Sequence, residues 1–191
     1  VHMDVDIGGS YGNKRGRKQI FLTCVASRIV ERPVKFIEDR MENLQADSFA
    51  RDYHITAEVA ADNDGTMKAL RIGTIADHGY TDAAANPSKF PAGLFSIVTG
   101  SYDFKTAYAE MDAYYTNKPP GGVAYRCSFR VTEAIHCIER MVDVLAQKLD
   151  VDPAELRVKN FVQPDQFPYQ SALGWEYDSG DYETALKKAM D

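Results

Sequence analysis

The sequence predicts an α+β fold, and three patterns carry that prediction. From Val131 onward, apolar side chains recur at the spacing of one amphipathic helix. Residues 51–61 and 67–77 instead alternate apolar and polar side chains around an Asp-Asn-Asp-Gly turn, which is typical of a β-hairpin. A glycine turn at residues 8–12 joins a strand pattern to a helix pattern. Mixed helices and strands of this kind favour an α+β architecture over a helical bundle or an all-β sandwich.

The first fifty residues predict a strand, a glycine turn, a helix and a second strand. Val1, Met3, Val5 and Ile7 alternate with polar residues, as in a half-buried strand. Residues 19–30 place apolar side chains mostly at helical spacing, and Pro33 ends that helix. Residues 34–37 then predict a short strand, so that residues 1–50 form one βαβ-like unit.

The remaining chain divides into four predicted parts. The hairpin occupies residues 51–80, and residues 79–100 form a long loop. A strand is expected over residues 104–115, followed by an irregular loop over residues 116–130. Residues 131–191 are mainly helical, with Asp152 capping a second helix that starts at Pro153. The aromatic segment 162–180 is expected to be a loop. The apolar stripe of the first helix comprises Ala134, Ile135, Ile138, Met141, Val142, Leu145, Ala146 and Leu149.

Composition excludes several classes of protein. The net charge is −6 with acids and bases interspersed, so no basic patch suggests nucleic-acid binding. No apolar run reaches the ~18–20 residues that span a bilayer. Three widely spaced cysteines indicate a reducing cytoplasm rather than a disulfide scaffold. The chain starts inside a strand pattern and ends inside a helix pattern, so we expect an internal fragment of a larger subunit.

The heptapeptide Ala-Tyr-Arg-Cys-Ser-Phe-Arg at residues 124–130 carries the strongest functional signal. Cys127 follows two glycines and precedes a helix, with Arg126 and Arg130 beside it. Positive charge and a helix N-terminus both favour thiolate over thiol. A thiolate suits either a soft metal ion or nucleophilic catalysis. The plainer alternative is a small buried side chain at a loop–helix junction.

The glycine turn at residues 8–12 is not a nucleotide-binding motif. It fits neither Gly-x-Gly-x-x-Gly nor the phosphate loop that ends in Gly-Lys-Ser/Thr. Glycines at the end of a strand do allow backbone N–H groups to approach a ligand closely. We therefore expect this turn to line a binding pocket.

The heptapeptide resembles the active-site loop of the molybdenum-containing large subunit of form I aerobic carbon monoxide dehydrogenases, in the xanthine oxidase family of molybdenum hydroxylases. The resemblance extends over nearly the whole chain. Its further stretches are Asp-Ile-Gly-Gly-Ser-Tyr-Gly-Asn-Lys at residues 6–14, Pro-Val-Lys at 33–35, Glu-Asp-Arg-Met-Glu-Asn at 38–43, Ser-Phe-Ala-Arg-Asp-Tyr-His at 48–54, Ala-Asp-His-Gly at 76–79, Gly-Ser-Tyr-Asp at 100–103, Arg-Val-Lys-Asn-Phe at 157–161 and Leu-Gly-Trp-Glu-Tyr-Asp-Ser-Gly at 173–180.

The resemblance implies roles for individual residues. Cys127 is the copper ligand, and Arg126 lies near the metal, where it stabilises oxyanion charge or forms a structural salt bridge. The turn Gly9, Ser10, Tyr11 and Gly12 lines the molybdenum pocket, and Tyr125 belongs to the same site. Ser10-Tyr11 departs from the family's usual Gly-Phe, which puts the detailed geometry of the pocket in doubt.

The resemblance also implies the reaction, the cofactors and the partners. The reaction is oxidation of carbon monoxide to carbon dioxide at a Mo–Cu centre, with water as the oxygen source. The cofactors are molybdopterin cytosine dinucleotide with molybdenum, and Cu(I). A small Fe–S subunit and a medium FAD subunit complete a dimer of heterotrimers and pass electrons to a quinone-type acceptor. The enzyme is cytoplasmic, with peripheral attachment to the inner face of the membrane left open, and this fragment alone is inactive.

Three other readings stay open at this point. Another hydroxylase of the same family could oxidise an aldehyde or a heterocycle, with Cys127 incidental. A cysteine hydrolase could use Cys127 with a histidine, although no nucleophile signature surrounds the thiol. A non-catalytic interaction module would suit the aromatic segment 162–180.

Overall fold

The structure is a computed structural model that describes residues 18–46, 52–80, 96–119 and 131–191. These residues belong to two compact units. The first contains residues 18–46, 52, 76–80 and 113–119, and the second contains residues 53–75, 96–112 and 131–191.

The first unit begins with two helices. Helix α1, Lys18–Val30, confirms the expected helix, and α2 spans Arg40–Ala46. The predicted strand at residues 34–37 is wrong: residues 33–39 are irregular, and Phe36 and Ile37 are exposed. The expected βαβ-like unit therefore lacks its second strand in the described residues. Its first strand and the glycine turn lie outside them.

Helix α2 was missed, although its start carries a local signal. The Asp39 carboxylate accepts a hydrogen bond from the backbone N–H of Glu42 (2.8 Å), and the Glu42 carboxylate accepts one from the N–H of Asp39 (2.9 Å). This reciprocal pair is a capping box, which satisfies two N–H groups that a helix start leaves without partners. An acidic residue followed three positions later by Glu is visible in the sequence and could have predicted the helix.

A three-stranded sheet of order β1-β2-β3 supports the second unit. Strands β1 (Tyr53–Ala61) and β2 (Met67–Asp77) confirm the hairpin, and β3 (Thr106–Tyr114) confirms the third strand. Side chains on β1 alternate between half-buried and exposed, and on β2 Leu70 and Ile72 are buried while Arg71 between them is exposed. One face of the sheet is therefore packed, and the other faces outward.

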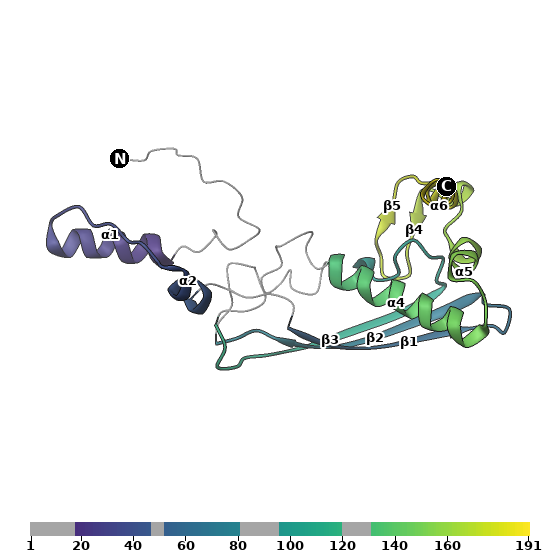
Figure 1. Ribbon diagram of the computed structural model, residues 1–191, viewed down its shortest axis with the longest axis horizontal. Helices are drawn as coiled ribbons and strands as arrows, with labels where there is room; N and C mark the ends of the chain where they lie inside the picture. The colour runs from purple at the N-terminus through teal and green to yellow at the C-terminus, as the bar shows by residue number, and fades with distance from the viewer. Residues whose placement is uncertain (1–17, 47–51, 81–95, 120–130) are drawn as a thin grey trace. The chain divides into compact units, whose positions relative to one another are not determined.

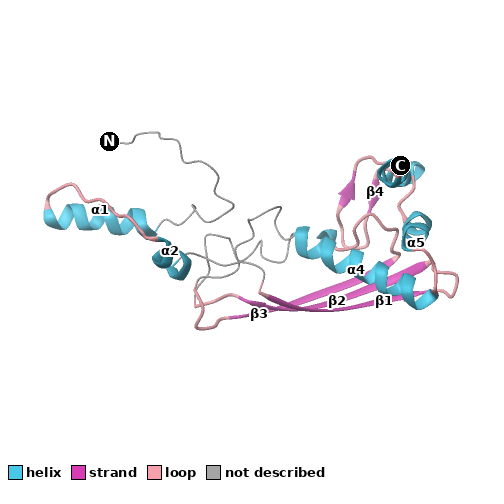
Figure 2. Cartoon of the chain, in the orientation of Figure 1, coloured by secondary structure: helices cyan, strands magenta, loops and turns pink. Residues whose placement is uncertain are grey.

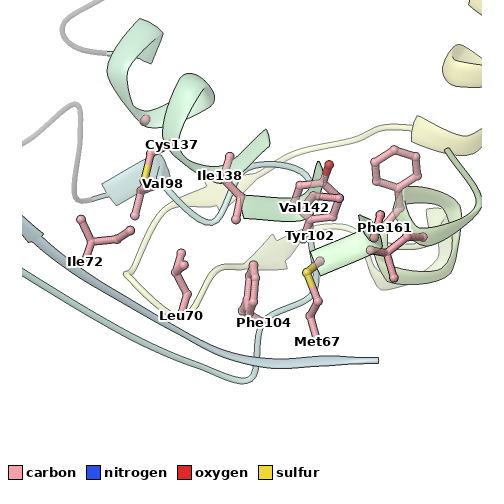
Figure 3. Packing of buried hydrophobic residues seen from close by; sticks show 13 residues of the cluster. Met67, Leu70, Ile72, Val98, Tyr102, Phe104, Cys137, Ile138, Val142 and Phe161 are labelled. Carbon is pink, nitrogen blue, oxygen red and sulfur yellow. The ribbon is translucent and has the colours of Figure 1, made fainter. Parts of the chain in front are cut away.

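Helix α4, Val131–Leu149, lies across the packed face of the sheet (Figures 1 and 2). Ala134, Ile138, Val142 and Ala146 confirm the predicted stripe, since each is at most 1% exposed. The stripe differs at its start, because Ile135 is 44% exposed while Cys137 is buried. Figure 3 shows Ile138 and Val142 among Leu70, Ile72, Val98, Tyr102, Phe104 and Phe161.

The end of the chain adds two helices and a small hairpin. Helix α5, Pro153–Asn160, confirms the predicted cap, since the Asp152 carboxylate accepts hydrogen bonds from the N–H groups of Ala154 and Glu155. Helix α6 spans Tyr182–Met190. The segment expected to be a loop contains a 3₁₀ turn, Pro164–Gln166, and two paired strands, β4 (Tyr169–Gln170) and β5 (Glu176–Tyr177). Strands of two residues are too short to show an alternating pattern, so the sequence could not predict them.

Candidate active site

The residues with predicted chemical roles all lie outside the described parts of the chain. They are Gly9, Ser10, Tyr11, Gly12, Tyr125, Arg126 and Cys127. Their predicted roles therefore stay predictions. What the structure does describe is the chain on either side of residues 120–130, which carry the heptapeptide.

Helix α4 fixes the chain on the C-terminal side. Its first described residue, Val131, is four positions after Cys127. Ala134 and Cys137 in its first two turns are buried in the core. The first described turns of α4 are therefore held by packing in the core.

A polar cluster fixes the chain on the N-terminal side, and we call it the Asp77 latch. It consists of the side chains of Asp52, Asp77, Thr116 and Lys118 and the backbone of Gly79. One carboxylate oxygen of Asp77 accepts hydrogen bonds from the Thr116 hydroxyl (2.7 Å) and the Gly79 N–H (2.8 Å). Its other oxygen lies 3.0 Å from the Lys118 ammonium, which also pairs with Asp52.

The contacts within the Asp77 latch shift the pKa values of its charged groups. The Asp77 side chain is only 15% exposed, and this burial opposes its negative charge. Hydrogen bonds from Thr116, Gly79 and Lys118 outweigh burial and leave the pKa of Asp77 below its ordinary value. Hydrogen bonds to Asp52 and Asp77 raise the pKa of Lys118. Asp77 and Lys118 are therefore both charged near neutral pH.

Backbone hydrogen bonds reinforce the latch. The N–H of Tyr80 donates to the carbonyl of Lys118 (3.0 Å), and the N–H of Thr116 donates to the carbonyl of Gly79 (2.9 Å). His78, which is 5% exposed, donates its N–H to the carbonyl of Tyr114 (2.8 Å). The stretch 76–79 was part of the family resemblance, but no role had been assigned to it. Its role here is to hold residues 114–118.

The other cysteines and histidines form no metal site in the described residues. Cys137 is buried in the core, and burial raises the pKa of its thiol. Cys24 is an exposed free cysteine on α1. No group of three or more His, Cys, Asp or Glu side chains in this part of the chain is arranged to hold a metal ion. His136 on α4 and His54 on β1 are exposed.

The outward face of the sheet carries a shallow groove of about 320 Å³. Arg71 crosses it, 3.7 Å from Glu58 on β1 and 3.8 Å from Glu110 on β3. These side chains are more than half exposed, so the groove is solvated and its charges are paired.

The Arg-Val-Lys-Asn-Phe stretch of the family resemblance is structural. The Arg157 guanidinium lies between Glu139 (2.8 Å) and Asp143 (2.9 Å) of α4. The Lys159 ammonium lies 2.9 Å from the Asp64 carboxylate in the hairpin turn. The buried Asn160 side chain bonds the backbone of the same hairpin. This motif therefore ties α5 to α4 and to the β1–β2 turn.

None of the described helices is long and apolar enough to cross a bilayer.

Comparison with known proteins places these features in context. Residues 1–161 match the family described as molybdopterin cofactor-binding domain. The chain is 59% identical over 187 residues to the carbon monoxide dehydrogenase large chain of Afipia carboxidovorans, covering 97% of this chain and 23% of that one. It is 32% identical over 180 residues to the nicotine 6-hydroxylase large subunit of Paenarthrobacter nicotinovorans, covering 93% and 22%.

Solved structures agree with the sequence comparisons. Reconstituted CO dehydrogenase from Oligotropha carboxidovorans superposes with a TM-score of 0.92 at 58% identity, covering 97% of this chain and 23% of that one. Quinoline 2-oxidoreductase from Pseudomonas putida 86 gives a TM-score of 0.87 at 30% identity, covering 96% and 23%. The chain therefore spans less than a quarter of the length of these relatives.

Proposed function

Because the chain belongs to the molybdopterin cofactor-binding domain family, we propose that it forms part of the catalytic large subunit of an aerobic carbon monoxide dehydrogenase. The reaction is the oxidation of carbon monoxide to carbon dioxide, with water as the oxygen source. The observation that carries the proposal is the 59% identity to a carbon monoxide dehydrogenase large chain over 97% of this chain. The heptapeptide at residues 124–130 supports it, since it supplies a cysteine between arginines.

The available donors fit a copper(I) site at Cys127. Copper(I) prefers a thiolate ligand. Of the other two thiols, Cys137 is buried in the core with its pKa raised, which disfavours the thiolate. Cys24 is exposed on α1, and no cluster of ligands surrounds it in the described residues. Cys127 has neighbouring positive charge, which favours its thiolate.

The remaining residues of the proposed site would bind and orient the cofactor or stabilise charge beside it. A molybdopterin cytosine dinucleotide cofactor with molybdenum and a copper(I) ion would together supply electron acceptance and a soft binding site for carbon monoxide. Backbone N–H groups of the turn Gly9–Gly12, with Ser10 and Tyr11, would donate to oxygen atoms of the cofactor. Tyr125 shapes the pocket. The Arg126 guanidinium would stabilise negative charge on oxygen as the product forms.

The proposed enzyme is larger than this chain. Its partners are a small Fe–S subunit and a medium FAD subunit in a dimer of heterotrimers, which deliver electrons to a quinone-type acceptor. The three cysteines of the chain are too few and too dispersed to hold an iron–sulfur cluster. We place the complex in the cytoplasm, and we expect the 191 residues alone to be inactive.

A second function in the same family has specific support. The nicotine 6-hydroxylase large subunit and quinoline 2-oxidoreductase are both at least 30% identical to this chain, and their names describe oxidation of heterocycles. On that alternative Cys127 is incidental, and the enzyme contains molybdenum without copper.

Metal analysis of the complete complex decides between the two functions. We expect copper and molybdenum in near-equal amounts, with carbon monoxide oxidation. Cys127→Ser should remove copper and activity while leaving molybdenum, because a serine oxygen is a poor ligand for copper(I). Cys24→Ser is the matched control, since Cys24 is an exposed thiol outside the proposed site, and it should change neither metal. Full copper and activity in Cys127→Ser would refute the copper site.

A further inference from the structure

Helix α1, Lys18–Val30, carries apolar side chains on opposite sides of its axis. Residues nine positions apart lie on opposite sides of a helix, because each residue turns the chain by about 100° and nine residues leave a net turn of about 180°. Ile20 and Ile29 form one such pair, and Phe21 and Val30 form another. All four residues are more than half exposed. Opposite sides of α1 therefore both present apolar surface.

The uncharged polar side chains of α1 already have hydrogen bonds within the first compact unit. Thr23 donates its hydroxyl to the carbonyl of Gln19 (2.7 Å), and Ser27 donates its hydroxyl to the carbonyl of Arg32 (2.7 Å). The Gln19 amide donates to the Glu38 carboxylate (3.2 Å). Burial of a polar group costs little free energy when its hydrogen bond is already made. The helix can therefore leave water without losing these bonds.

The sequence from Gln19 to Val30 contains one charged residue, Arg28. It lies in the last turn of α1, where the negative end of the helix dipole favours a cation. A long arginine side chain can keep its charged end in water while its backbone is buried. Arg28 is therefore compatible with burial of the rest of the helix.

Neither a membrane nor a second copy of the chain fits a helix that is apolar on opposite sides. The 13 residues of α1 are fewer than the ~20 that span a bilayer. A helix that lies on a membrane surface has a strongly charged or polar face, and α1 lacks one. A contact between two copies covers the side of a helix that faces the partner. The interior of a protein surrounds a helix on all sides, and this is where helices apolar all round are found.

We propose that α1 is an interior helix of the complete large subunit, surrounded by apolar segments of that subunit that lie outside these 191 residues. The chain covers 23% of the carbon monoxide dehydrogenase large chain of Afipia carboxidovorans, so a subunit of that length has ample further chain to surround α1. The inference rests on the proposal that this chain is part of a larger subunit. It does not depend on carbon monoxide as the substrate.

Alkylation of single thiols by iodoacetamide in the complete complex tests whether α1 is covered on all sides. Cys24 is one reporter, and Val25→Cys and Val30→Cys, each combined with Cys24→Ser, are two others. The three positions point in directions about 100–140° apart around the helix. The reference is the same complex unfolded in urea, and mass spectrometry reads each peptide separately. Asp62→Cys is the matched control, because the Asp62 side chain is 59% exposed but belongs to a charged pair with Lys68.

Cross-linking identifies what covers the helix without a substitution in α1. Photo-leucine, a diazirine analogue of leucine, is incorporated in place of leucine throughout the complex. The residue of interest is Leu22, which is more than half exposed in the structure. Mass spectrometry then identifies the peptide joined to Leu22. The mass of the cross-linked chain shows whether that peptide belongs to the same large subunit.

We expect all three thiols of α1 to react at least about 100-fold more slowly than in the unfolded complex, because their alkylation requires local opening. Asp62→Cys should react at nearly the unfolded rate. Leu22 should cross-link to a peptide outside residues 1–191 of the same large subunit.

Alkylation of any one of the three α1 thiols at nearly the unfolded rate would show that this side of the helix faces water, and it would overturn the inference. Cross-links from Leu22 that form only within residues 1–191, with another subunit or with a second copy would overturn it as well. If the thiols are protected and the expected cross-link forms in a complex that neither contains copper nor oxidises carbon monoxide, the proposed function fails while the inference stands.

Discussion

Asn160 offers a stringent test of the fold, because its side chain joins α5 to the β1–β2 hairpin. The residue is 7% exposed. Its amide oxygen accepts from the N–H of Met67 (2.8 Å), and its amide nitrogen donates to the carbonyls of Gly65 (3.0 Å) and Leu156 (2.9 Å). Asn160→Ala removes all three bonds and leaves the buried N–H of Met67 and the carbonyl of Gly65 without their partner.

The expected cost follows from those two groups. Each buried backbone group left without a partner costs about 1–3 kcal/mol, so we expect the two groups together to cost about 2–6 kcal/mol. Asn160→Asp separates the acceptor role of the side chain from its donor role. The carboxylate can still accept the hydrogen bond from the Met67 N–H, but it lies against the carbonyl oxygens of Gly65 and Leu156 without a donor for them. It should be at least as damaging near neutral pH. The control is Lys159→Gln, whose partly exposed pair with Asp64 is worth about 0–1 kcal/mol.

Hydrogen exchange of the Met67 amide in the complete large subunit measures the free energy of local opening. Urea unfolding of the same variants gives the global value. An Asn160→Ala variant within about 0.5 kcal/mol of wild type by both methods would show that water or rearrangement replaces these bonds, and our account of the motif would be wrong.

Three other predictions concern charge. Arg157→Met should destabilise the large subunit by about 1–3 kcal/mol in urea unfolding, because Asp143 loses its ion pair and Glu139 keeps the hydrogen bond from the Tyr102 hydroxyl but loses the guanidinium. No change in stability would contradict the bridging role. Burial opposes the charge of Asp103, but hydrogen bonds from Lys105, Gln166 and Tyr169 outweigh it and lower its pKa. The stability that Asp103 contributes is therefore fully present above pH ~3.9 and is lost as the pH falls further. Asp103→Asn should make this loss of stability in acid smaller. Arg126→Lys should slow turnover at least about tenfold with metal content and thermal midpoint nearly unchanged, and wild-type turnover would demote Arg126 to a structural role.

Local signals in the sequence predicted most of the helices and the hairpin. Helix α4 follows from the repeat of Ala134, Ile138, Val142 and Ala146, which share one face of a helix. Helix α5 follows from Asp152 and Pro153, because a capping carboxylate and a proline at the first position act within one turn. Such signals need no information about the rest of the fold.

The errors have a common physical origin. A short apolar run such as residues 34–37 becomes a strand only if another strand supplies hydrogen bonds, and no strand pairs with it in the described residues. Ile135 was expected in the apolar stripe but is exposed, and Cys137, which was not assigned to the stripe, is buried, because the rotation of α4 is set by what packs against it. Both outcomes depend on partners distant in sequence, which periodicity does not report.

The exposure of the apolar side chains of helix α1 also could not be predicted from its sequence. Its exposed apolar residues, Ile20, Phe21, Leu22, Val25, Ile29 and Val30, are each more than half exposed, and at 100° per residue they point around most of its circumference. A helix that is apolar on nearly all sides is typical of a protein interior. We therefore expect the isolated 191 residues to bind a hydrophobic dye and to aggregate.

Several of the stretches that resemble the carbon monoxide dehydrogenases have structural roles. Arg157, Lys159 and Asn160 hold α5 against α4 and the hairpin, and Asp77 holds the segment before the heptapeptide. Any enzyme of this fold could share this packing, so these residues indicate the family but do not indicate the substrate. In the proposed function, substrate choice would depend instead on Cys127. The copper content of Cys127→Ser is therefore the measurement that tests carbon monoxide as the substrate.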